Sequence, residues 1–125
     1  FDRALSELKS GRKRSHWIWF VLPQLRCLGR SATAIHFGIE DLEEARAYLA
    51  DPVLRERLER VIAVLAEQLE RPDQSLRKLM GKSIDATKTI SSLTLFEAAG
   101  LSSATAVLEQ LGERCKETER AMRFS

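Results

Sequence analysis

The residues best suited to chemistry stand in one block, GRKRSHWIWFVLPQL, at positions 11–25. The block opens with three consecutive cations, Arg12, Lys13 and Arg14, which are followed by Ser15, a residue type that favours the N-cap of a helix. Guanidinium groups bind phosphate or carboxylate in bidentate geometry, and a helix N-terminus adds backbone donors and a favourable dipole. The block therefore predicts a binding site for an anion.

The residues that follow the cations can extend this chemistry. His16 can transfer a proton near neutral pH, and Trp17 can stack on a base or hold an apolar ligand surface. A simpler interpretation is structural. Trp19 and Phe20 are expected to be core residues of a short helix that Pro23 ends, Trp17 suits the core as well as it suits a ligand, and the cations then form only a solvated corner.

A second block, DATKTISSLTLF at positions 85–96, carries its own charged and hydroxyl side chains. Helical spacing places Asp85, Lys88 and Ser92 close to one face. Asp85 and Lys88 are three residues apart and can pair with each other, which is the simpler interpretation. If Lys88 instead projects into a pocket, it joins the arginines of the first block around one anion, and Asp85 orients it or acts as a base.

Neither block has the spacing of a nucleophile–base triad, a Walker loop or a zinc site, so no reaction class, cofactor or metal site is predicted. The leading hypothesis is a pocket, formed by both blocks, for a small phosphorylated or nucleotide-like anion. One alternative is a weak enzyme in the same pocket, acting on a glycosidic or phosphate bond with His16 or Asp85 as general acid or base. Another is a protein-interaction module anchored on an exposed Trp17. The candidate ligand-binding residues are Arg12, Lys13, Arg14, Ser15, His16, Trp17, Lys88 and Ser92.

The elements that must position these blocks are predicted to be helices. Asp51-Pro52 is a capping residue followed by a first-turn proline, and apolar residues then recur every three or four positions to about Arg71. Shorter helices are predicted from Leu42 to about Ala50 and after Asp73. A long terminal helix is expected to carry on one stripe Leu101, Ala104, Leu108, Leu111, Cys115 and Met122. The pattern predicts an all-α fold, a single domain over residues 1–125 built as a bundle of about six to seven helices with short connections.

Residues 86–96 are the ambiguous segment, because six of the eleven positions are β-branched, serine or threonine. An extended conformation therefore competes with a helix. We predict a helix, since an isolated strand in a helical protein would leave its backbone groups without partners.

Composition restricts the class of protein. Twenty basic and 18 acidic side chains leave a net charge of +2, and no basic face is seen to continue from the first block, so nucleic acid is not expected as a partner.

Cys27 and Cys115 are too few and too far apart for a disulfide framework, which favours free thiols in a cytoplasmic protein. No stretch approaches the roughly 20 apolar residues that span a bilayer, so no membrane association is expected. The oligomeric state is not predicted.

Three segments, ELKSGRKRSHWIWFVLPQLRCLGRS, GIEDLEEARAYLADPVLRERL and SIDATKTISSLTLF, resemble the family known as domain of unknown function 1810. The signature of that family is a Gly-Arg-Lys-x-x-His-Trp-x-Trp-Phe block ending in Pro-Gln-Leu and a second Asp-x-x-Lys-x-x-Ser-Ser-x-Thr-Leu-Phe block. The resemblance implies a small, mainly α-helical fold without an established activity, and a first helix that is shortened here. Leu22 stands where the family has an aromatic residue and Cys27 where it has glycine, which affects local packing.

Overall fold

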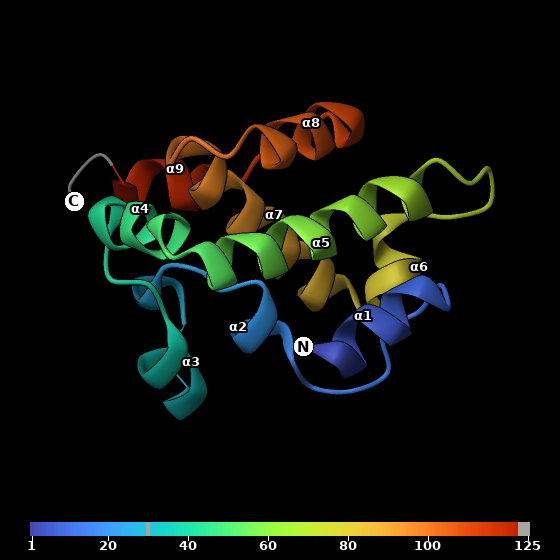
Figure 1. Cartoon of the computed structure of the whole chain (residues 1–125), viewed down its shortest axis with the longest axis horizontal. Helices are drawn as coiled ribbons and strands as arrows, with labels where there is room; N and C mark the ends of the chain where they lie inside the picture. Colours follow the sequence, from blue (N-terminus) through green and yellow to red (C-terminus); the bar gives the residue numbers. More distant parts are fainter. Residues whose placement is uncertain (30, 123–125) are drawn as a thin grey trace.

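The computed structural model describes residues 1–29 and 31–122, and in these residues the fold is helical. A 3-10 turn at Arg26–Leu28 precedes α3, and a backbone bridge joins Leu25 and Ile39. In Figure 1, α5 crosses the middle of the molecule, with α8 and α9 above it and α1 and α6 below it. The helices are α1 (Asp2–Lys9), α2 (Ile18–Val21), α3 (Ala32–Phe37), α4 (Leu42–Ala50), α5 (Pro52–Leu69), α6 (Leu76–Met80), α7 (Ser83–Ala98), α8 (Ser102–Leu111) and α9 (Lys116–Met122).

The all-α prediction is confirmed, but the expected number of helices is too low, since the described residues form nine α-helices. The predicted long terminal helix is two helices. Gly112 adopts a left-handed conformation with φ of 68° and donates its N–H to Leu108 O at 2.8 Å, which ends α8. The apolar stripe continues past this break because α9 also packs on α7, so periodicity alone gave no sign of the interruption.

Helix α5 shows how local sequence sets a boundary. The Asp51 side chain accepts hydrogen bonds from the backbone N–H groups of Val53 and Leu54 at 2.9 and 3.1 Å, and Pro52 occupies the first turn. These contacts satisfy donors that have no partner inside a helix. The buried face of α5 then packs against α1, α4 and α8, as the apolar spacing predicts.

Residues 86–96, for which the sequence left helix and strand in competition, belong to α7 and are helical throughout. The prediction of a helix is confirmed. The buried threonines of α7 keep their hydrogen bonds, as Thr89 Oγ1 donates to Asp85 O at 2.8 Å and Thr94 Oγ1 to Ile90 O at 2.7 Å. Such bonds to the preceding turn let threonine occupy a helix interior. Because α2, α4, α6, α8 and α9 all pack on α7, it is buried on most sides, which explains why it lacks a clear polar face.

The two sequence blocks meet where the loop between α1 and α2 crosses the junction of α6 and α7. Lys13 N–H donates to Leu79 O at 2.7 Å, which holds the loop against α6. Gly81 follows α6 in a left-handed conformation with φ of 82°, and a Cβ there would lie 3.1 Å from Lys13 O. Glycine therefore permits both the turn into α7 and the close approach of the loop.

Candidate functional site

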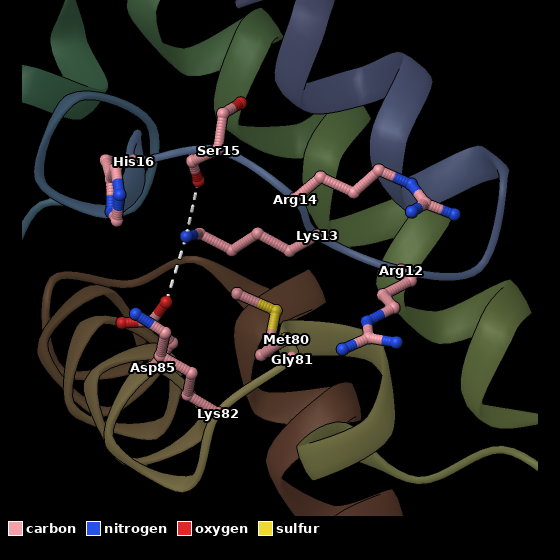
Figure 2. Close-up of a pocket in the computed structure, with 9 residues that line it drawn as sticks. All are labelled: Arg12, Lys13, Arg14, Ser15, His16, Met80, Gly81, Lys82 and Asp85. Atoms are coloured by element: carbon pink, nitrogen blue, oxygen red, sulfur yellow. Dashed lines mark hydrogen bonds and ion pairs between the residues drawn. The ribbon is translucent and has the colours of Figure 1, made fainter.

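A buried ion pair joins the two blocks. Lys13 Nζ donates to Asp85 Oδ2 at 2.9 Å and to Ser15 O at 2.6 Å (Figure 2). The two charged side chains are 4% and 11% exposed, and the ammonium group also lies 5.1 Å from the centroid of the Trp17 ring. The pair is therefore a structural link over 72 residues of sequence, and its charges largely cancel.

This pair corrects one prediction. Asp85 is bonded to Lys13, not to Lys88 three residues further along its own helix. The Lys88 ammonium instead lies 5.9 Å from the centroid of the Trp19 ring, a cation–π geometry. Lys88 is thus available to a ligand, whereas Lys13 is not a free cation.

Glu7 organises the loop that carries the cations, and the sequence analysis missed it. Its carboxylate accepts from Arg14 N–H at 2.8 Å, Ser15 N–H at 3.0 Å, Ser15 Oγ at 2.5 Å and Trp17 Nε1 at 2.9 Å. Partial burial opposes ionisation of Glu7, but these hydrogen bonds, that of the Ser15 hydroxyl foremost, outweigh it and lower the pKa from 4.5 to about 2. An acidic residue four positions before the Gly-Arg-Lys sequence was the only available signal.

These contacts decide the roles of several predicted site residues. Ser15 is not an N-cap, because α2 begins at Ile18 and the Ser15 side chain bonds to Glu7. Trp17 is 6% exposed with its indole N–H bonded, so it cannot anchor a protein partner from an exposed position.

Of the other residues singled out in the two blocks, Trp19 and Ser92 are buried and Phe20 is not. Trp19 is buried as expected, whereas Phe20 is 51% exposed and packs edge-to-face on Phe37 with ring centroids 4.5 Å apart. The assignment of Phe20 to the core was wrong, because a helix of four residues is too short for spacing to define its buried face. Ser92 is fully buried and donates to Pro23 O at 2.7 Å, so its hydroxyl is engaged within the fold.

The ion pair forms part of the wall of a cleft of about 400 Å³, here called the basic cleft. Four cations and one carboxylate line it, so the lining carries a net charge of +3 with histidine neutral. Figure 2 shows Lys13 directed at Asp85, and the Arg14 side chain extending toward α1. The lining residues are Arg12, Lys13, Arg14, Ser15, His16, Met80, Gly81, Lys82 and Asp85.

Three of these cations have no ion-pair partner in residues 1–29 and 31–122: Arg12, Arg14 and Lys82. The N-terminus of α7 adds backbone donors at the same place, because Lys82 occupies its N-cap position and no side chain caps the first turn. Helices α3 to α6 are each capped by an Asp or Ser side chain, whereas α1, α2 and α8, like α7, have no side-chain cap. Uncapped N–H groups and unpaired cations are both ligands for anions.

The basic surface extends further than the sequence indicated. A neighbouring cleft is lined by Arg12 together with Arg77 and Lys78 of α6. The inference that no basic face continues from the first block was therefore wrong, because α6 is separated from that block in sequence and adjoins it only in the fold.

His16 and Asp85, the candidate acid and base, line the basic cleft together, and both also line a second cleft of about 330 Å³ that includes Trp19 and Lys88. His16 is exposed. In the part of the chain that the structure describes, no hydrogen bond joins the two side chains. The described residues also contain no group of three or more His, Cys, Asp or Glu side chains suited to a metal ion.

Residues 1–122 match a family described as a protein of unknown function, DUF1810. The chain belongs to this family. The DUF1810 chain is also similar to the crystal structure of the conserved hypothetical protein Rv1873 from Mycobacterium tuberculosis, with 36% sequence identity and a TM-score of 0.87. That similarity covers 98% of this chain and 87% of the other.

A comparison of the DUF1810 chain with curated proteins gave no match. None of its described helices is both long enough and apolar enough to cross a membrane. Both cysteines are free thiols, Cys27 exposed and Cys115 half-buried. Function must therefore be inferred from the chemistry of the clefts.

Proposed function

We propose that the basic cleft binds a small phosphorylated anion. The observation that carries the proposal is the lining itself, in which Arg12, Arg14 and Lys82 form no ion pair within the described residues, while the single acidic side chain is neutralised by Lys13. Cations gathered without acidic partners repel one another, and a phosphate group relieves that repulsion. In contrast, Arg55 and Arg60 on α5 each lie within 4 Å of a glutamate carboxylate.

The loop that presents these cations is held in place before any ligand arrives. Arg12 N–H donates to Glu7 O at 3.2 Å, Arg14 N–H to the Glu7 carboxylate at 2.8 Å, and Lys13 N–H to Leu79 O at 2.7 Å. A backbone fixed at three successive residues has little conformational entropy left to lose on binding. This supports a binding site rather than a flexible basic corner.

A test of the proposal is Arg12→Ala, measured by calorimetry with inorganic phosphate, pyrophosphate and ribose 5-phosphate. We expect affinity to fall by about tenfold or more, since one charge-assisted contact is lost. The free energy of unfolding should change by less than about 0.5 kcal/mol, because Arg12 is exposed and makes no ion pair in the described residues. Lys82→Ala should weaken binding similarly, and the double variant should be non-additive because both cations contact one ligand.

The matched control is Arg46→Ala, which removes an exposed arginine from α4 and should leave every affinity unchanged. Dissociation constants above millimolar for all three anions, or an unchanged affinity in Arg12→Ala, would refute the proposal. Turnover of a phosphate ester in the same mixtures, lost in His16→Ala but with binding retained, would instead identify the enzyme that the alternative hypothesis describes.

A further inference from the structure

Gln24 is a buried amide that the fold does not use. It is 3% exposed, and its Nε2 donor has no hydrogen-bond partner among the described residues. Only its backbone is engaged, as Gln24 O accepts from Ile39 N–H at 2.7 Å. An unsatisfied buried donor destabilises a fold, and such a group calls for an explanation outside folding.

The amide lines a cleft of about 430 Å³, here called the apolar cleft. Its walls include Trp19, Leu28 and Ile84, and most of its surface is apolar. The Trp19 ring packs closely against Gly29, where a Cβ atom would lie only 2.9 Å from the indole. A mostly apolar cleft whose wall also carries polar side chains, among them Gln24, Ser31 and Lys88, fits an uncharged, largely planar ligand that carries a hydrogen-bond acceptor.

The apolar cleft is connected to the basic cleft. It shares Trp19, Ile84 and Lys88 with the second cleft, and the second cleft shares His16, Lys82 and Asp85 with the basic cleft. The three clefts therefore form a groove that changes from cationic at the α1–α2 loop to apolar at Gln24. The Lys88 ammonium, over the Trp19 ring at 5.9 Å, stands between the two ends.

We propose that the apolar cleft holds the base of a nucleotide whose phosphate lies in the basic cleft, an inference that rests on the proposed anion binding. The Gln24 amide donates to a ring nitrogen or carbonyl oxygen of the base, and the Trp19 ring, which is 7% exposed, forms part of the cleft wall beside the base. Lys88 lies at the junction, where the ribose and its phosphate link the two ends. The ligand class is thus a nucleoside phosphate rather than a simple phosphate or a sugar phosphate.

The test compares adenosine 5′-monophosphate and uridine 5′-monophosphate with ribose 5-phosphate by calorimetry. At least one nucleotide should bind about tenfold more tightly than ribose 5-phosphate, and Gln24→Met should abolish that difference while leaving the affinity for ribose 5-phosphate unchanged. Stability of Gln24→Met should be equal to or higher than that of the parent, because methionine removes an unpaired buried amide. Gln110→Met, at an exposed position of α8, is the control and should alter neither affinity.

A second measurement does not depend on the Gln24 variant. In Trp17→Phe, Trp19 is the remaining tryptophan of the chain, and the nucleotide but not ribose 5-phosphate should quench its fluorescence. If ribose 5-phosphate binds and neither nucleotide binds more tightly, or if Gln24→Met leaves the difference intact, the base subsite is refuted and anion binding stands. If no phosphate compound binds below millimolar, the proposed function itself fails, and the inference fails with it.

Discussion

Replacing Lys13 with methionine is expected to lower the free energy of unfolding by about 3–5 kcal/mol, the usual cost of removing one partner from a buried ion pair. The substitution leaves the Asp85 carboxylate buried without its cation, and it also removes the hydrogen bond to Ser15 O that positions the loop. Equilibrium unfolding in urea gives the value directly. Sequence reasoning had treated Lys13 as a surface ligand, for which little effect on stability would follow.

Two further variants separate the unpaired charge from lost packing. The double variant Lys13→Met/Asp85→Leu removes both charges and should recover much of the lost stability, since apolar replacement of a buried pair is often close to neutral. Arg55→Ala, which breaks the exposed pair with Glu59 on α5, should cost no more than about 1 kcal/mol. A loss below that level in Lys13→Met would show that the pair does not hold the two blocks together.

Glu7→Gln is expected to destabilise the chain by about 1.5–3 kcal/mol at pH 7, because hydrogen bonds to a charged acceptor are replaced by weaker ones. The carboxylate serves as the common acceptor for Arg14, Ser15 and Trp17, so the loss should also loosen the cationic loop. Near-ultraviolet circular dichroism should report the change at Trp17, whose indole N–H is one of the donors.

The pH dependence of the same variant follows from the lowered pKa of Glu7. The folded-state pKa of about 2 lies below the ordinary value of 4.5, so the stabilisation is fully present above pH 4.5 and is lost as the pH falls through about 2. The difference in stability between the parent and Glu7→Gln should therefore shrink over that range. Glu67→Gln, at an exposed position of α5, should show no such trend, and a constant difference for Glu7→Gln would contradict the assigned role.

Much of the helical architecture could be read from local sequence. Asp51-Pro52 marked the start of α5, and the apolar spacing after it defined the buried face, because capping and helical periodicity depend on residues within a few positions of one another. The helical state of residues 86–96 was also predictable, although their propensities are mixed. A strand in this segment would have had no partner strand for its backbone groups, which favoured a helix. In the structure, the hydroxyl groups of Thr89 and Thr94 donate to carbonyl oxygens four residues earlier.

The candidate site depended on contacts that no local rule contains. The cations of the first block are evident in the sequence. Only the fold shows that Lys13 is neutralised by Asp85 and that Arg77 and Lys78 of α6 extend the basic surface. Glu7 gave almost no sequence signal, and Gln24 gave only its place in the Pro-Gln-Leu of the family signature, because a carboxylate or an amide acquires its role from the groups that packing brings to it.

The sequence by itself determined that the fold is helical, where α5 begins and which residue types could contact an anion, since these follow from side-chain chemistry and short-range spacing. Tertiary structure alone decided which cations are free. That outcome depends on the close approach of the α1–α2 loop to the start of α7, where burial forces Lys13 and Asp85 to pair and leaves the exposed Arg12 and Lys82 without an ion-pair partner in the described residues.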